Sequence, residues 1–100
     1  MARAVHKFSP ATPYVVNGSW QGSFAFDGTL LQVVVIPPVP ETLYTFIIKD
    51  DEGMPLFLRN DVRGTLCISE LDIILFPGEK NILINSSVDG LFRVKLIYQQ

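Results

Sequence analysis

The sequence is poor in the residues on which most catalytic and metal sites depend. Its 100 residues include one cysteine, Cys67, and one histidine, His6. A single cysteine cannot form an internal disulfide or a paired-cysteine metal site. A base such as His6, in a loose N-terminal stretch, would not be held beside a nucleophile. We therefore expect no catalytic residue, no metal ion and no cofactor, and we expect that the protein is not an enzyme.

Charge and long apolar runs are also scarce. Charged residues make up 18% of the chain, the net charge is −2, and the Lys and Arg residues form no run. Nucleic-acid binding needs a basic surface, so we expect no nucleic-acid partner. Apolar runs such as Val33–Ile36 are too short to cross a bilayer, and the basic N-terminus lacks the apolar segment of a signal peptide. These features predict no membrane contact and synthesis in a cytoplasm.

Hydrophobic residues, in contrast, are abundant and follow a strand period. They make up 48% of the chain, which excludes a disordered chain and suits one core in one domain. Apolar and polar residues alternate in short segments, as at Tyr44, Phe46 and Ile48, and turn residues recur at intervals of about 8–12 residues. No segment keeps a helical period. We predict an all-β domain, a single antiparallel sandwich of about eight short strands in jelly-roll or immunoglobulin-like order.

The pattern divides the chain into an extended, proline-containing N-terminal arm, residues 1–13, and a sandwich domain, residues 14–100. Thr29–Ile36 is apolar on both faces, which indicates a central strand or one covered by another protein. With so little charge, some apolar side chains are expected to face a partner, including a second copy of the chain. The residues predicted for such an interface are His6, Phe8, Trp20, Leu30, Val34, Ile36, Leu91 and Ile97.

Three polar or reactive features are candidates for chemical sites, and the sequence favours a structural interpretation of each. Cys67 lies within a strand pattern without a nearby cation, so a buried, inert thiol is expected. Glu70 and Asp72 share a strand face, and a solvated face is favoured over an acid–base pair. Asp50–Gly53 has consecutive acids, whereas calcium loops space their ligands, so a hairpin turn with Gly53 at positive φ is predicted.

The eleven aromatic residues provide a further alternative. An exposed row of aromatic rings would suit a carbohydrate-binding module. Most of them, however, fall at alternating positions that are expected to face the core. Trp20 is the least certain, because its strand comes early in the chain and suits a sheet edge.

One stretch of the sequence resembles a known group of proteins. In Tyr44–Phe57 a Tyr opens a strand, Asp50 ends it, Gly53 follows, and an apolar pair starts the return strand. The strand Leu30–Ile36 precedes it, and Asn81–Asn85 and Leu91–Tyr98 follow as a closing pair. In this order the elements resemble small β-rich structural proteins of tailed bacteriophages, over about residues 19–98.

That resemblance implies a virion protein made in the cytoplasm of a bacterial host. Members of this kind decorate or cement the capsid, which implies contacts with the major capsid protein and a homo-oligomer such as a trimer. The N-terminal arm would then act as a tether that adds a strand to a neighbour. Two alternatives stay open, namely a neck, head-completion or tail component and a carbohydrate- or receptor-binding module.

Overall fold

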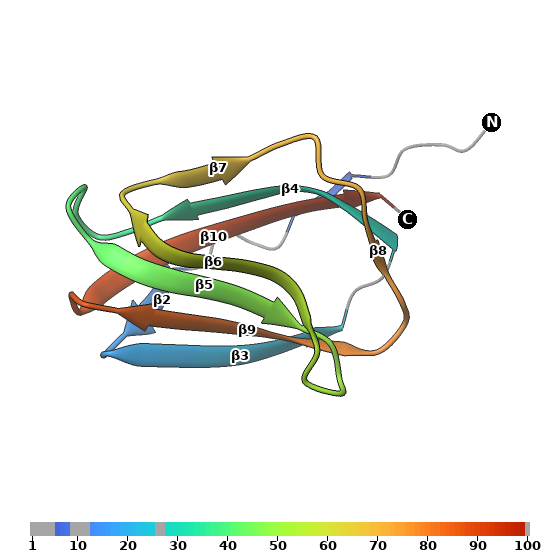
Figure 1. Ribbon diagram of the computed structural model, residues 1–100, viewed down its shortest axis with the longest axis horizontal. Helices are drawn as coiled ribbons and strands as arrows, with labels where there is room; N and C mark the ends of the chain where they lie inside the picture. The colour runs from blue at the N-terminus through green and yellow to red at the C-terminus, as the bar shows by residue number, and fades with distance from the viewer. Residues whose placement is uncertain (1–5, 9–12, 26–27, 100) are drawn as a thin grey trace.

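The computed structural model describes residues 6–8, 13–25 and 28–99 (Figure 1). Within them the chain forms ten β-strands and no helix. The strands are β1 (His6–Phe8), β2 (Pro13–Val16), β3 (Ser19–Ala25), β4 (Gly28–Ile36), β5 (Leu43–Lys49), β6 (Pro55–Arg63), β7 (Leu66–Ile68), β8 (Ile73–Leu75), β9 (Glu79–Ser86) and β10 (Gly90–Gln99). The predicted all-β class is confirmed.

The strands form two antiparallel sheets that pack face to face. The six-stranded sheet has the order β1-β10-β4-β7, with β2 also paired to β10 and β8 also paired to β4. The four-stranded sheet has the order β3-β9-β5-β6 and covers the first sheet in Figure 1. Every pairing is antiparallel. The molecule is longest along the strands, with dimensions of 44 × 25 × 21 Å.

Both edges of the six-stranded sheet are interrupted strands. On one side, β2 pairs with the start of β10 and β1 with its end. On the other side, β8 pairs with the start of β4 and β7 with a later stretch of the same strand. Counting β1 with β2 and β7 with β8, the ten strands occupy eight positions, which agrees with the predicted number.

The core lies between the two sheets, where the predicted alternation places it. Tyr44, Phe46 and Ile48 of β5 are buried, as are Ile82 and Ile84 of β9. Across the sandwich, Phe92, Val94 and Leu96 of β10 have no exposed surface. Two edge-to-face ring pairs, Tyr44 with Phe92 and Phe46 with Phe57, pack at centroid distances of 5.3 and 6.1 Å. Such pairs contribute about 0.5–1.5 kcal/mol each beyond the burial of their surface.

A bulge in β4 makes one interface prediction wrong. Strict alternation would place Leu30 on the same face as Val34 and Ile36. The register against β10 shifts between Ile97 and Tyr98, so that Leu31 is an extra residue in β4. A bulge of this kind reverses the faces of the residues beyond it. Leu30 therefore points into the core, where it is fully buried, and it cannot face a partner.

A second irregularity lies in β6. Asn60 and Asp61 are turn residues by composition, yet they continue the strand. Val62 pairs with Tyr44 and Arg59 with Phe46, so β6 has one more residue than β5 in this stretch. Asp61 takes a φ of 53°, a left-handed conformation that Asp tolerates better than most residues. The result is a bulge within a long strand rather than a turn.

The extended N-terminal arm predicted for residues 1–13 is not confirmed. His6–Phe8 pairs with Gln99–Ile97 of β10, so this stretch belongs to the six-stranded sheet of its own chain. Pro13 begins β2, opposite Arg93. Residues 1–5 and 9–12 lie outside the described residues.

Trp20 lies on the inner face of β3, at one edge of the four-stranded sheet. It is half-buried against the core, and its ring centroid lies 6.4 Å from that of Phe24. Between them, a Cβ added at Gly22 would lie 2.5 Å from the Trp20 ring. A side chain at this position would therefore have to displace the Trp20 ring.

Candidate interaction surface

Four of the predicted interface residues lie together on the outer face of the six-stranded sheet. Val34 and Ile36 of β4 pair with Lys95 and Arg93 of β10, and paired residues point to the same side of a sheet. By alternation along β10, Leu91 and Ile97 share that side. Ile36 is 44% and Leu91 52% exposed, whereas Val34 and Ile97 are half-buried. The structure thus brings together residues that are up to 63 positions apart in the sequence.

Two cations lie among these apolar side chains. Arg93 and Lys95 are both exposed and are separated by one residue of β10. We name the set Val34, Ile36, Leu91, Arg93, Lys95 and Ile97 the basic–apolar face. Exposed apolar area bordered by charged groups is typical of surfaces that bind other proteins.

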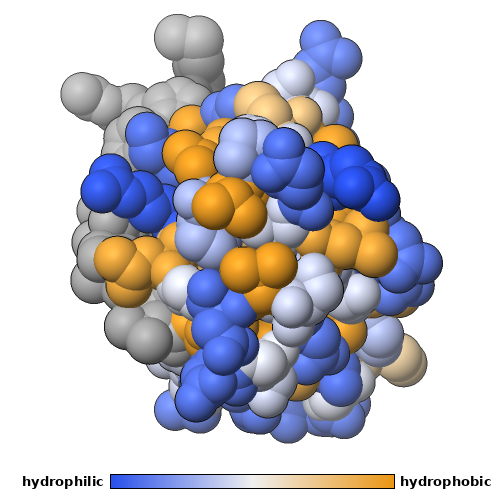
Figure 2. Space-filling model, turned by 90° about the vertical axis from the view of Figure 1, so that its left-hand side faces the viewer, coloured by the Kyte–Doolittle hydropathy of each residue, from blue (hydrophilic) through white to orange (hydrophobic). Residues whose placement is uncertain are grey.

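The basic–apolar face is hollowed where β4 ends and β10 begins. A groove of about 320 Å³ lies there, and we name it the Leu91 groove. It is lined by Ile36, Pro37, Pro38, Leu91 and Arg93. A second hollow of about 170 Å³ adjoins it along β10 and includes Val34 and Lys95. Figure 2 views the molecule from this end and shows apolar side chains grouped between charged ones.

The other four predicted interface residues are not part of the basic–apolar face. Leu30 lies in the core, and Trp20 lies on the inner face of the opposite sheet. The backbone of Phe8 pairs with Ile97 and that of His6 with Gln99, which places β1 beside the far end of the face. The side chains of His6 and Phe8 lie outside the described residues.

The prediction of a buried Cys67 is wrong. Cys67 points outward from β7, pairs with Val34 and is exposed. The reason is that β7 is an edge strand whose outer face meets solvent, while the neighbouring Leu66 fills the core. The amide nitrogen of Gln32 lies 3.7 Å from its sulfur, as a weak hydrogen bond.

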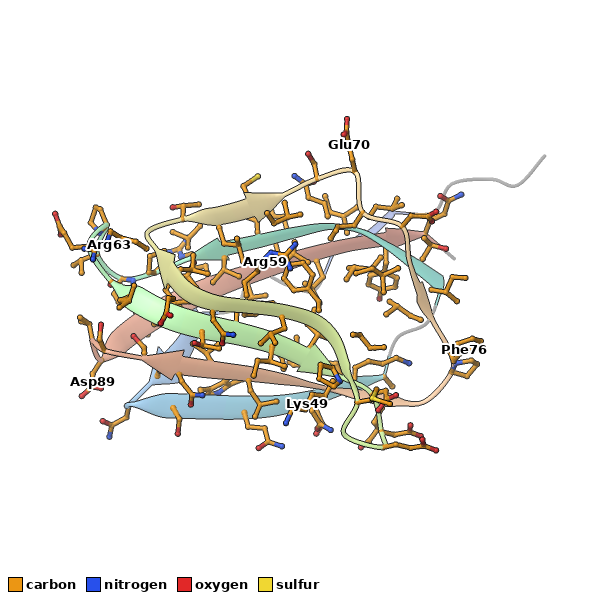
Figure 3. The ribbon with its side chains drawn as sticks, in the orientation of Figure 1. Lys49, Arg59, Arg63, Glu70, Phe76 and Asp89 are labelled. Carbon is orange, nitrogen blue, oxygen red and sulfur yellow. The ribbon has the colours of Figure 1, made fainter. Side chains whose placement is uncertain are left out.

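The two other chemical candidates are exposed loop features. Glu70 takes a φ of 62° between β7 and β8, and Figure 3 shows its carboxylate pointing away from both sheets. Asp72 is exposed in the same loop. Asp50 closes the turn between β5 and β6, because one carboxylate oxygen accepts hydrogen bonds from the amides of Glu52 and Met54 at 2.9 and 2.8 Å. Gly53 has a φ of 83°, as the turn prediction required.

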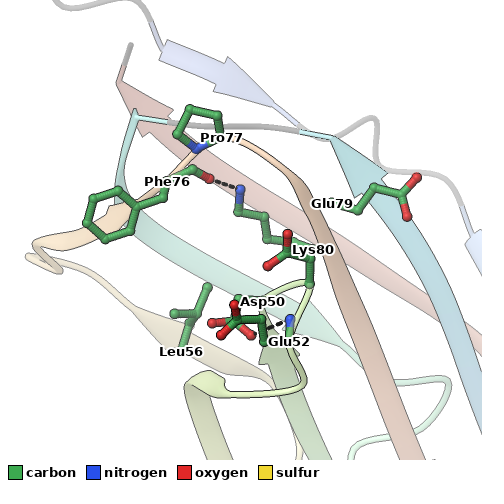
Figure 4. Close-up of a pocket in the computed structure, with 8 residues that line it drawn as sticks. Asp50, Glu52, Leu56, Phe76, Pro77, Glu79 and Lys80 are labelled. Carbon is green, nitrogen blue, oxygen red and sulfur yellow. Dashed lines mark hydrogen bonds between the residues drawn. The ribbon is translucent and has the colours of Figure 1, made fainter.

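A buried lysine lies beside this turn, and it was not among the residues predicted from the sequence. Lys80 of β9 is 2% exposed and pairs with Phe24. Its ammonium donates hydrogen bonds to the carbonyl oxygens of Phe76 and Gly78, the latter at 2.9 Å, and so holds the loop between β8 and β9 closed (Figure 4). The Lys80 position falls in phase with Ile82 and Ile84, and that inward phase was the available signal.

The cavity beside Lys80 is small and acidic. Its volume is about 220 Å³, below the range of about 300–1,000 Å³ that is usual for small-molecule sites. Its lining comprises Asp50, Asp51, Glu52, Leu56, Phe76, Pro77, Glu79 and Lys80. The lysine is already hydrogen-bonded to the backbone, so we assign this cavity a structural role.

The described residues contain no group of three His, Cys, Asp or Glu side chains placed to hold a metal ion. They also contain no helix with the length and apolarity that crossing a bilayer requires. No protein-family model matches the sequence, and no curated protein matches it.

Proposed function

We propose that this chain is a non-enzymatic structural protein of a tailed-bacteriophage virion, and that it decorates and stabilises the capsid. In this role it binds the major capsid protein and neighbouring copies of itself. The observation that carries the proposal is the basic–apolar face, where exposed Ile36 and Leu91 lie beside Arg93 and Lys95 on a rigid sheet. Such a face provides apolar contact area with charges that set orientation and partner choice.

The strand order supports a jelly roll as the finer fold type. The positions β1/β2-β10-β4-β7/β8 in one sheet face β3-β9-β5-β6 in the other. One hairpin, β5–β6, stays within a sheet, and every other connection between positions passes to the opposite sheet. Jelly rolls of eight strands are common in viral capsid proteins and in lectins. The fold therefore supports a virion protein only by analogy. The specific support for this role comes from the basic–apolar face.

A carbohydrate-binding module shares the fold analogy but has less support from the surface. The ring of Trp20, which would be the natural sugar platform, packs over Gly22 on the inner face. The outer face of the four-stranded sheet carries the aliphatic side chains of Ile47, Leu58 and Leu83, which are neighbours in the strand register. It also carries polar groups, such as the Ser23 hydroxyl, which donates a hydrogen bond of 2.7 Å to Asn81. A face whose described residues include no stacking aromatic ring is a weaker sugar site than an exposed tryptophan would provide.

Binding to heads tests the proposed function. The purified chain is mixed with heads that lack it, from a phage that carries its gene, and separately with tails. We expect saturable sedimentation with heads. Lys95→Glu should weaken it at least tenfold, because a lattice multiplies the effect of each contact. Lys49→Glu, the same change on the outer face of the other sheet, should bind normally.

The outcomes separate the alternatives. Sedimentation with tails but not heads would replace the capsid role with the neck or tail role. Binding to neither component would contradict a virion role altogether. Equal binding by the Lys95 and Lys49 variants would contradict the assignment of the basic–apolar face as the contact surface.

A further inference from the structure

The most exposed aromatic side chain of the described residues belongs to neither the core nor the basic–apolar face. Phe76 follows β8 and is 74% exposed. Figure 3 shows it projecting from one end of the sandwich. Its loop is held from inside, because the Lys80 ammonium binds the carbonyl oxygens of Phe76 and Gly78. An apolar ring in water on a braced loop is a feature expected of an anchor for another surface.

The surroundings of Phe76 are acidic. Asp50, Asp51, Glu52 and Glu79 line the same cavity as Phe76 (Figure 4), and all but Asp50 are exposed. Asp51 approaches the Phe76 loop directly, since a Cβ added at Gly78 would lie 3.2 Å from its carboxylate oxygen. We name Phe76 with these four acids the Phe76 knob. In the Phe76 knob, one exposed aromatic ring lies beside acidic side chains.

The Leu91 groove has the opposite character. It is apolar, it contains the Arg93 side chain, and the adjoining hollow adds Lys95. The described residues that line these two hollows include no acid. Knob and groove are therefore complementary in charge, and each presents apolar surface to the other.

One chain cannot bring the knob to its own groove. Leu75, next to Phe76, pairs with Gly28 at the start of β4, whereas Ile36 of the groove ends that strand. Nine residues of strand separate the two by about 26 Å at roughly 3.3 Å per residue. A rigid sheet holds them at opposite ends, as Figure 1 shows for the two ends of β4. The complementary partner is thus a second copy.

We propose that the Phe76 ring of one copy inserts into the Leu91 groove of the next. The acids of the knob then face Arg93 and Lys95 of that neighbour. This contact is head-to-tail, so each copy uses one knob and one groove, and successive copies form a closed ring or an open chain. The inference rests on the proposed function, because it specifies how the decorating copies contact one another.

Two variants, each lacking one half of the contact, test the proposal. Phe76→Asp removes the ring and keeps the groove, and Leu91→Asp disrupts the groove and keeps the knob. Both residues are mostly exposed, so both variants should fold, which a urea titration verifies. In sedimentation velocity we expect the wild type to assemble and each variant alone to be monomeric. An equimolar mixture should form a dimer with one copy of each variant, because one intact contact remains.

The result for the mixture distinguishes this contact from others. If Phe76→Asp alone assembles as the wild type does, the knob is not part of the interface. If the wild type assembles and the mixture stays monomeric, knob and groove do not meet. A wild type that stays monomeric at all concentrations also overturns the proposal. The proposed function is tested separately, because the head-binding experiment does not depend on this contact between copies. Gln21→Asp, on the outer face of β3, should assemble normally.

Discussion

Replacing Lys80 with glutamate is expected to destabilise the fold by about 3–5 kcal/mol, the cost of an uncompensated buried charge. Lys80 is almost fully buried, and its ammonium binds two carbonyl oxygens of the β8–β9 loop. A carboxylate in its place would face those oxygens and the acids Asp50, Asp51, Glu52 and Glu79 that line the adjoining cavity. Like charges and unpaired acceptors both oppose this arrangement.

Two further variants separate charge from packing at this position. Lys80→Met keeps most of the apolar stem but leaves the carbonyl oxygens of Phe76 and Gly78 without this donor, at a cost of about 1–3 kcal/mol. Arg63→Glu reverses a charge at an exposed position (Figure 3) and should change stability by about 0.5 kcal/mol or less. Urea unfolding midpoints measure all three. A Lys80→Glu variant as stable as Arg63→Glu would contradict the structural role of the lysine.

The stability of the wild type is expected to fall steeply as the pH rises from 10 to 12, and Tyr44→Phe should remove that loss. Burial raises the pKa of Tyr44 to about 12 from 10.0, and a backbone hydrogen bond at Leu66 offsets part of the shift. The phenol also donates a hydrogen bond of 2.7 Å to the carbonyl oxygen of Gly64. The folded state therefore favours the protonated phenol.

The sign follows from proton linkage. Between pH 10 and 12 the unfolded chain has lost the Tyr44 proton while the folded chain keeps it, so stability decreases as pH rises. A pKa difference of two units corresponds to about 2.7 kcal/mol. This stability is fully present below pH 10 and is lost as the pH passes through the folded value.

Unfolding measured across this pH range checks the Tyr44 prediction. Tyr44→Phe should be less stable near neutral pH by about 1 kcal/mol, because the Gly64 carbonyl loses its donor. Its stability should then vary less with alkaline pH than that of the wild type. Tyr98→Phe, which leaves Tyr44 in place, should retain the steep wild-type decline. Identical profiles for the Tyr44 variant and the wild type would show that burial of this phenol is not linked to folding.

Alternation in the sequence predicted most of the core but could not locate the bulges. The faces of β5, β9 and β10 follow the two-residue period, so Phe46 lies in the core as the alternation predicted, and Ile84 and Val94 are buried in the same way. Leu30 was misplaced because the extra residue Leu31 reverses the phase of β4. A bulge depends on the partner strand as well as on the local sequence, so a run such as Leu30–Ile36 carries no local mark of it.

The basic–apolar face was predicted only in part, because the pairing of strands is not visible in the local sequence. Val34, Ile36, Leu91 and Ile97, which were predicted as interface residues, lie on one outer face, because apolar residues out of phase with the core point away from it. That β4 lies beside β10 was not predictable, since strand count does not fix strand order. Phe76 was missed because Pro77-Gly78 indicates only where the strand ends. The loop that carries its ring is held by hydrogen bonds from Lys80, a contact that the local sequence does not show.

Localising the chain in the virion by cryo-electron microscopy tests the central claim most directly. Particles are prepared from a phage that carries the gene, with particles from a deletion mutant as the control. We predict density for this sandwich on the outside of the capsid shell, with the basic–apolar face covered by the major capsid protein or a neighbouring copy. Particles that match the deletion control at every position, with no density for this domain in head, neck or tail, would contradict the account.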